Sequence, residues 1–180
     1  MNLYRVLPLK PSAAQHEAGG ARFVPDSTDG RIDNVGVYKV LYLAREPEGT
    51  IAETYGRIPL WKPAMLKSAS SVPHSLVTYS LPDMNQVFSL VDTLALASLC
   101  VANPSQIVAR NRPFTQALAL RIYGPHRYIG VSWWHYYEPA WASFGLWDTS
   151  SLEVLHAEQL ANSLPLVQRT AKHIVRQFIP

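Results

Sequence analysis

The sequence predicts an α+β domain. Strand-like and helix-like runs both occur along its 180 residues. They do not follow the strict strand–helix–strand order that builds a parallel sheet. No internal repeat or second domain is visible, so we expect one compact domain over residues 1–180. A chain of this length buries about 70% of the surface that it exposes when unfolded, which is enough for a core of its own.

Strands are expected where short runs of β-forming residues are bounded by turn residues. One such run, residues 37–44, has so few polar residues that both of its faces should be covered. Two aromatic-rich runs, 128–134 and 141–147, flank the turn residues Glu138 and Pro139 and therefore predict an antiparallel hairpin. The other expected strands are 3–7, 76–81 and 154–157.

Helices are expected where apolar residues recur every three or four positions. One starts at Pro47, which suits a first helical turn because the missing N–H of proline has no partner there. Ile51, Tyr55 and Ile58 give this helix a stripe that faces the core. The other expected helices are 85–102, which has a broad apolar face, 104–109, 113–123 and 164–178.

The composition is that of an ordinary globular chain. It is 48% hydrophobic and 16% charged, with a net charge of +3. Its basic residues form no run, which argues against direct nucleic-acid binding and gives slight support to an anionic ligand. The single cysteine, Cys100, cannot form an internal disulfide, and we expect it in the core.

We expect a cytoplasmic protein with no membrane partner. The N-terminus lacks a charged segment followed by an apolar one, so no secretory signal is visible. No apolar stretch is long enough to span a bilayer.

The helix that starts at Pro47 carries a candidate functional carboxylate, Glu53, off its apolar stripe. Two glycines, Gly49 and Gly56, flank Glu53 and cost about 1 kcal/mol each relative to alanine. A group that approaches the helix closely beside Glu53 would explain that cost. The alternative for Glu53 is a solvated ion pair with Arg57, four residues on, which contributes only a few tenths of a kcal/mol.

Several stretches of the chain together resemble the RES domain. That family is named for an arginine, a glutamate and a serine, and its known members are NAD-consuming toxins of RES–Xre toxin–antitoxin pairs. The order and spacing of the stretches carry the resemblance, which covers most of the chain. They are Tyr4-Arg5-Val6, Gly20-Ala21-Arg22-Phe23, Leu41-Tyr42-Leu43-Ala44, Pro47-Glu48-Gly49-Thr50-Ile51-Ala52-Glu53, Phe114-Thr115-Gln116-Ala117-Leu118-Ala119 and Tyr128-Ile129-Gly130-Val131.

The resemblance implies a fold like that of the ADP-ribosyltransferases, with a mixed, split β-sheet flanked by helices around an NAD cleft. It implies cleavage of the nicotinamide–ribose bond of NAD, with phosphate or water as acceptor, and an Xre-type antitoxin that blocks the cleft. Two alternatives remain open: a protein ADP-ribosyltransferase, and a catalytically silent binding module on the same fold. Family members have a short link after the arginine, so residues 25–36 look like an insertion at the rim of the site.

The reaction indicates a role for Glu53. Cleavage of the glycosidic bond passes through an oxocarbenium-like state, which a nearby carboxylate stabilises while it also bonds a ribose hydroxyl. Tyr42 lies in the preceding strand. It would either stack on a ring or bond a ribose of the substrate, or it is a core tyrosine.

Arg22 is the candidate for binding the pyrophosphate of NAD, since a guanidinium binds planar oxygens in a bidentate way. The neighbouring Gly20 allows close approach to a ligand. The alternative for Arg22 is a surface ion pair with an acidic residue such as Asp26 or Asp33.

At the family serine this chain departs from the pattern. RES domains commonly show Gly-Ile-x-Tyr-x-Ser, and the matching run here is Gly130-Val131-Ser132-Trp133-Trp134-His135. His135 therefore stands where the serine belongs. Ser132 comes three positions earlier, and strand alternation places it on the opposite face. His135 either bonds a phosphate or ribose, or packs among aromatic side chains.

Aromatic residues gather around this position. They would clamp a ring of NAD or pack against the last helix. The six histidines of the chain form no i,i+4 pair and no Cys–His spacing, so no metal site is expected. The phosphate-loop and Rossmann glycine patterns are also missing. The aromatic residues are Trp133, Trp134, Tyr136, Tyr137 and Trp141.

Overall fold

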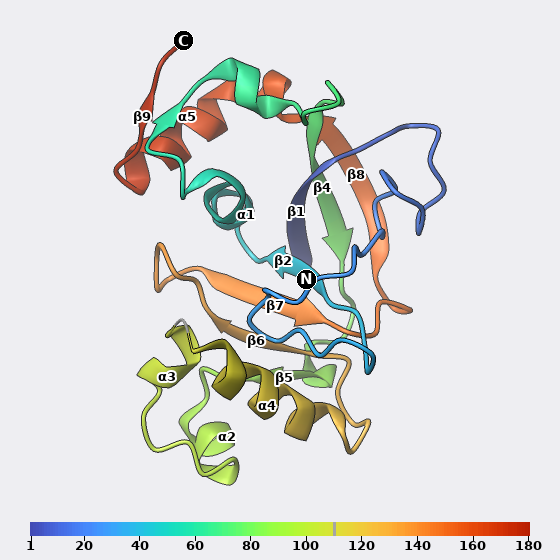
Figure 1. The fold of residues 1–180 in the computed structure, drawn as a ribbon, viewed down its shortest axis with the longest axis vertical. Helices are drawn as coiled ribbons and strands as arrows, with labels where there is room; N and C mark the ends of the chain where they lie inside the picture. The colour runs from blue at the N-terminus through green and yellow to red at the C-terminus, as the bar shows by residue number, and fades with distance from the viewer. Residues whose placement is uncertain (110) are drawn as a thin grey trace.

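The computed structural model, which describes residues 1–109 and 111–180, has an α+β fold built on one seven-stranded sheet (Figure 1). The strand order is β5-β6-β7-β2-β1-β4-β8. Neighbouring strands are antiparallel except β5 and β6, so the sheet is mixed. The strands are β1 Asn2–Pro8, β2 Leu41–Ala44, β4 His74–Ser80, β5 Val87–Ser89, β6 Gly130–Trp134, β7 Ala142–Leu146 and β8 Glu153–Gln159.

The sheet is split between β1 and β2. These strands share a single pair in register, Tyr4 with Ala44. By contrast, β1 pairs with β4 along its whole length, and so does β2 with β7. Figure 1 shows β1, β4 and β8 running across the direction of β2, β7 and β6. The predicted compact α+β domain with a mixed, split sheet is confirmed.

Helices cover both halves of the sheet (Figure 1). α1 (Pro47–Tyr55) and α5 (Leu164–His173) pack on the half that contains β1 and β4, around Val6 and Leu76. α2 (Thr93–Ser98), α3 (Ser105–Val108) and α4 (Arg112–Tyr123) belong to the other half. A third apolar cluster joins the two halves of the sheet. It includes Leu3, Leu41, Val77, Phe144 and Leu146.

Helix α1 sits at the split and satisfies the backbone there. The hydroxyl of buried Thr50 accepts a hydrogen bond from the Val6 N–H at 2.9 Å. Val6 lies beyond the single pair with β2, so no strand partner exists for this N–H on that side. A buried donor without a partner costs about 1–3 kcal/mol. The Thr50 hydroxyl therefore lets β1 and β2 separate without leaving the Val6 N–H buried and unpaired.

Most expected elements are present, and two are corrected. Residues 85–102 do not form one helix, because their first part adds a strand to the edge of the sheet. Val87–Ser89 form β5, parallel to β6, and the Asp92 carboxylate then caps α2 by accepting from the N–H groups of Leu94 and Ala95. Cys100 follows α2 with a φ of 55° and is exposed, so its predicted core position is wrong.

The last helix is shorter than expected. It ends at His173, and Val175 then takes a left-handed conformation with a φ of 57°. The chain turns there, and β9 (Gln177–Phe178) pairs in parallel with β3 (Leu60–Trp61). Within the described part of the chain, no helix combines the length and apolar character that crossing a bilayer requires.

The hydrogen bond between Thr50 and Val6 predicts that one conservative substitution at Thr50 destabilises the protein. Thr50→Val removes the acceptor and keeps the shape of the side chain. We expect the free energy of unfolding to fall by about 1–3 kcal/mol, because the Val6 N–H stays buried without a partner. Thr54→Val is the matched control, since the Thr54 hydroxyl only donates to the Thr50 carbonyl in its own helix, at 2.8 Å. Urea unfolding measures the free energy of unfolding of both variants, and an equal decrease in the two would contradict this account.

Candidate active site

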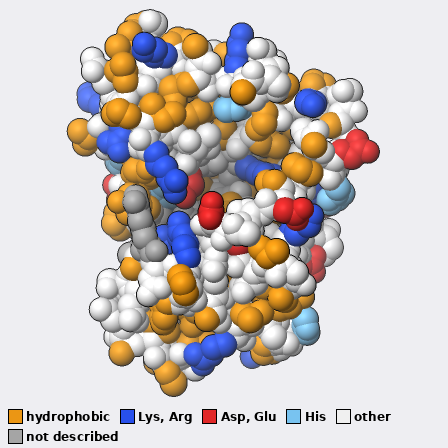
Figure 2. Space-filling view, viewed as in Figure 1, with side chains coloured by type: hydrophobic (Ala, Val, Ile, Leu, Met, Phe, Trp, Pro, Cys, Tyr) orange, Lys and Arg blue, Asp and Glu red, His pale blue; other side chains and the backbone are white. Residues whose placement is uncertain are grey.

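A cavity of about 170 Å³ opens where β1 and β2 separate. Strands β1, β2, β6 and β7 and helix α1 contribute to its walls. Figure 2 shows this side of the molecule hollowed between its two halves, with acidic and basic side chains at the hollow. The polar and aromatic side chains that line the cavity include Arg5, Tyr42, Glu53, Trp133, His135 and Ser143.

Glu53 reaches the cavity from α1. Its side chain is 67% exposed, and its Oε2 lies 3.7 Å from Nε2 of His135. Among the described residues it forms no ion pair with Arg57, the alternative partner expected from sequence. A carboxylate at a cavity mouth is open to a ligand as well as to water.

The two glycines of the Glu53 region bring the β6–β7 hairpin against the helix. A Cβ on Gly49 would lie 3.5 Å from the ring of His135, and one on Gly56 would lie 2.3 Å from the ring of Tyr137. Any side chain at Gly56 would therefore displace that ring. The groups that approach α1 closely are thus aromatic side chains of this same chain.

His135 is a buried structural contact at the cavity wall. It is 2% exposed, and its ring meets Trp141 edge-on at 5.4 Å. The Tyr137 N–H donates to its Nδ1 at 3.2 Å, so Nε2 carries the proton and donates to the Gly49 carbonyl at 2.9 Å. Burial lowers the pKa of His135, although the Glu53 carboxylate and the Gly49 carbonyl oppose the shift. Both ring nitrogens of this neutral histidine have partners within the chain.

Tyr42 anchors the turn that precedes its strand. Its hydroxyl donates to Asp33 Oδ1 at 2.7 Å and accepts from the Ile32 N–H at 3.2 Å. Burial raises the pKa of Tyr42. Gly30 packs so tightly against this hydroxyl that a Cβ would lie 2.1 Å from it. Tyr42 therefore lines the cavity while holding the turn over residues 30–33 beside it.

The structure does not bring Arg22 or Gly20 to this cavity. The Arg22 guanidinium donates to the carbonyl of buried Leu152, and its Nε is buried without a partner. Gly20 is enclosed in a turn, where a Cβ would lie 1.9 Å from the Ala14 carbonyl. Arg22 ties the loop before Phe23 to the residue that precedes β8, whereas Gly20 packs within that loop, and Arg22 borders a different cavity. Arg22, the candidate for binding the pyrophosphate, therefore lies outside the cavity that Glu53 lines, and this expectation is corrected.

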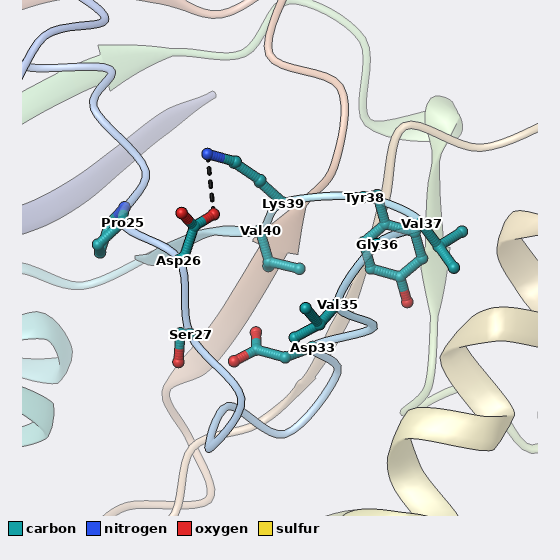
Figure 3. A pocket seen from close by; sticks show the side chains of 10 residues that line it. All are labelled: Pro25, Asp26, Ser27, Asp33, Val35, Gly36, Val37, Tyr38, Lys39 and Val40. Atoms are coloured by element: carbon teal, nitrogen blue, oxygen red, sulfur yellow. Dashed lines mark ion pairs between the residues drawn. The ribbon is translucent and has the colours of Figure 1, made fainter.

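The aspartates suggested as alternative partners of Arg22 are also occupied elsewhere. Asp26 pairs with Lys39 at 2.9 Å on the exposed loop drawn in Figure 3. Asp33 accepts from Tyr42 and from the Gly30 N–H, the latter at 2.7 Å. This loop borders a cavity of about 330 Å³, which has no wall in common with α1.

A second glycine-led arginine, Arg31, lies near Glu53 instead. Arg31 is 9% exposed, and its guanidinium donates to the carbonyls of Ile107 and Ala109, the latter at 2.9 Å. Burial and then the positive charge of Arg112 lower the pKa of Arg31, whereas the Glu53 carboxylate and the Tyr42 side chain raise it. Arg31 does not itself line the cavity, but it lies close enough to Glu53 and Tyr42, which do, to interact with them electrostatically.

Sequence analysis missed Arg31, although a signal was present. Gly30-Arg31-Ile32 is also a glycine-led arginine, and it stands only ten positions before Leu41. The link from Arg31 to that strand is short, whereas residues 25–36 separate Arg22 from it.

Two further cavity residues were not predicted. Arg5 donates to the Phe23 carbonyl at 2.7 Å. Burial lowers its pKa, yet a guanidinium keeps its proton at neutral pH. Ser143 is buried on β7, opposite Trp133, and brings a hydroxyl to the cavity. The predicted Ser132 instead pairs with Phe144, and it is not among the residues that line this cavity.

Comparison with known proteins supports the fold. The chain is similar to one in the crystal structure of the M. tuberculosis MbcT–MbcA toxin–antitoxin complex, with a TM-score of 0.63 and 18% sequence identity. The match covers 95% of this chain and 88% of that one. No family model and no curated protein matches the sequence. Within the described residues, no group of three or more His, Cys, Asp or Glu side chains is placed to hold a metal ion.

The buried His135 predicts that acid destabilises the protein. Its pKa in the folded state lies below the ordinary 6.5, so the unfolded chain binds the proton first as the pH falls. The stability contributed by neutral His135 is complete above pH 6.5 and is lost as the pH falls through its folded-state pKa. Burial lowers the pKa of His74 as well, with the same sign.

We therefore expect the melting temperature of His135→Gln to fall less than that of the parent when the pH is lowered from about 7.5 to about 5.5. The Gln amide keeps a donor for the Gly49 carbonyl but does not titrate in this range. Thermal unfolding at the two pH values tests the expectation. An equal loss in parent and variant would contradict it.

Proposed function

We propose that this chain is an NAD-consuming toxin of the RES type, which cleaves the nicotinamide–ribose bond with phosphate or water as acceptor. The observation that carries the proposal is the cavity at the sheet split, lined by Glu53, Tyr42 and Arg5 with Arg31 close by. The likeness of the fold to a chain of a toxin–antitoxin complex supports the toxin role. The sequence resemblance supports NAD as the substrate.

The geometry suits a reaction whose transition state is stabilised by nearby charge and which needs no strong proton donor. Nicotinamide leaves as a neutral amide from a cationic ring, so no strong acid is required. The ribose passes through an oxocarbenium-like state, and Glu53 offers it negative charge together with an acceptor for a ribose hydroxyl. The half-buried Arg5 and the buried Arg31 supply positive charge for the diphosphate, because each guanidinium has five N–H donors and keeps its charge.

In this proposal His135 positions other groups and does not touch the substrate. Its two ring nitrogens are engaged by Gly49 and Tyr137, so it fixes the distance between α1 and the hairpin. The hydroxyl that lines the cavity belongs to Ser143, on the neighbouring strand. We propose that Ser143, rather than Ser132 or His135, fills the role of the family serine.

We also propose that an antitoxin of the Xre type occupies the cavity mouth and blocks the exposed Glu53. The motivation is the toxin–antitoxin complex that contains the similar chain. The test is coexpression with the cognate antitoxin. Copurification together with suppressed nicotinamide release supports the partnership, and full release in the presence of bound antitoxin would refute blockage of the site.

Nicotinamide release from NAD is the first measurement. We expect the parent to release nicotinamide and Glu53→Gln to be slower by about 100-fold or more, because an electrostatic contact to the transition state is lost. Glu48→Gln is the matched control: Glu48 lies on the same helix, pairs with Arg169 at 2.8 Å and does not line the cavity. It should keep its turnover.

Phosphate dependence of the release separates phosphorolysis from hydrolysis. No release with or without phosphate, combined with labelling of a protein acceptor, would favour the ADP-ribosyltransferase alternative. Binding of NAD without any turnover would favour the silent module.

The two glycine-led arginines give a paired test of the site. Lysine keeps the charge but lacks the planar fork of donors that binds a diphosphate. We expect Arg31→Lys to raise the KM for NAD by about tenfold. Arg22→Lys should leave the KM unchanged and lower the melting temperature, since Arg22 bonds the Leu152 carbonyl. The opposite pattern in the steady-state kinetics would return the substrate role to Arg22.

A further inference from the structure

The turn over residues 30–33 is buried, although it belongs to no helix or strand. Arg31, Ile32 and Asp33 are all buried residues. Backbone groups in a buried segment need hydrogen-bond partners from the protein, because water does not reach them. The partners of this turn include side chains from two other elements, the strand β2 and the helix α4. Such contacts fix the position of the turn.

Helix α4 holds the turn through Thr115. The hydroxyl of this buried residue donates to the Arg31 carbonyl at 2.6 Å. Two carbonyls at the N-terminal end of its own helix, those of Asn111 and Arg112, lie farther away, at 3.3 Å each. The single proton of the hydroxyl therefore goes to Arg31, although a threonine inside a helix often bonds the preceding turn of that helix.

The next residue of α4, Gln116, holds the other side of Arg31. Its Nε2 donates to the Gly30 carbonyl at 3.0 Å and to the Thr28 carbonyl at 3.1 Å. The Gly30 and Arg31 carbonyls belong to the two peptide groups that flank the Arg31 Cα. Two neighbouring side chains of α4 therefore fix the direction in which the Arg31 side chain leaves the backbone.

The same turn is bonded to the wall of the cavity. The Tyr42 hydroxyl accepts from the Ile32 N–H at 3.2 Å and donates to Asp33 at 2.7 Å, and Tyr42 lines the cavity. The Asp33 carboxylate also accepts from the Gly30 N–H at 2.7 Å. The turn is clamped between Tyr42 and α4, so the contacts to α4 set where Arg31 stands relative to the cavity.

We propose that Thr115 and Gln116 are positioning residues of the candidate active site and act through Arg31. The inference rests on the proposed function for the role of Arg31 in binding a diphosphate. Neither Thr115 nor Gln116 lines the cavity, so we expect neither to touch the substrate. A guanidinium binds a diphosphate through a fixed fork of N–H donors. A small rotation of the Arg31 backbone therefore turns this fork away while the positive charge remains.

Thr115→Val removes the donor and keeps the shape of the side chain. We expect the KM for NAD to rise by about fivefold, on the scale of one lost hydrogen bond, with kcat unchanged. Thr115→Ser keeps the hydroxyl and should retain the parent KM. Thr170→Val is the matched control, because the Thr170 hydroxyl is also buried but bonds the Leu166 carbonyl of its own helix, at 2.9 Å. It should keep the parent KM even if its melting temperature falls.

A double-mutant cycle tests whether Thr115 acts through Arg31. Arg31→Lys lacks the fork, so adding Thr115→Val should raise the KM of that variant by less than about twofold. An undiminished rise in that background, or a KM of Thr115→Ser as high as that of Thr115→Val, refutes the positioning role. Gln116→Met removes the other donor and keeps the length of the side chain. It should raise the KM in the same way, and it carries the same cycle if Thr115→Val does not fold.

The outcomes separate this proposal from the proposed function. If the parent cleaves NAD and both Thr115→Val and Gln116→Met keep the parent KM, the positioning role is refuted and the reaction stands. If the parent does not cleave NAD, the proposed function fails, and calorimetric titration with inorganic pyrophosphate decides. Binding to the parent that Thr115→Val weakens and Thr115→Ser retains supports the positioning role. No binding to the parent, or equal binding to the parent and Thr115→Val, refutes it.

Discussion

The hydrogen bond between the Val6 N–H and the Thr50 hydroxyl is the contact on which the site depends. It lets β1 and β2 part after a single shared pair without leaving a buried donor unsatisfied. The same contact seats α1 in the gap, and Glu53 follows Thr50 by one turn, at the mouth of the cavity. A continuous sheet would have no room for either the helix or the cavity.

The site combines an exposed carboxylate with cations that are more enclosed. The carboxylate of Glu53 stands at the entrance, whereas the cations of Arg5 and Arg31 are held inside by backbone carbonyls. Such carbonyl partners fix the plane of a guanidinium without cancelling its charge. An anionic ligand at this cavity would therefore meet preorganised positive charge, and little reorganisation would be needed for it to bind.

Local sequence patterns were enough for the fold class and for most elements, because strands and short helices carry their own periodicity and turn residues. They failed over residues 85–102, where the apolar spacing of a helix also served a strand at the sheet edge. The candidate site was predictable in part. Glu53, Tyr42 and His135 do line one cavity. Arg22 and Arg31 are each led by a glycine, and only the tertiary contacts to the Leu152 and Ala109 carbonyls tell them apart.

The strand order also governs when the site can exist during synthesis. The cavity draws Arg5 from the first strand and Ser143 from β7, and β2 completes its pairing only with β7. A nascent chain whose β7 is still inside the ribosome has β6 but lacks the other strand of the hairpin, so the cavity is not yet formed on it. Formation of the cavity therefore waits for β7, although Arg5 and Glu53 precede that strand in the chain.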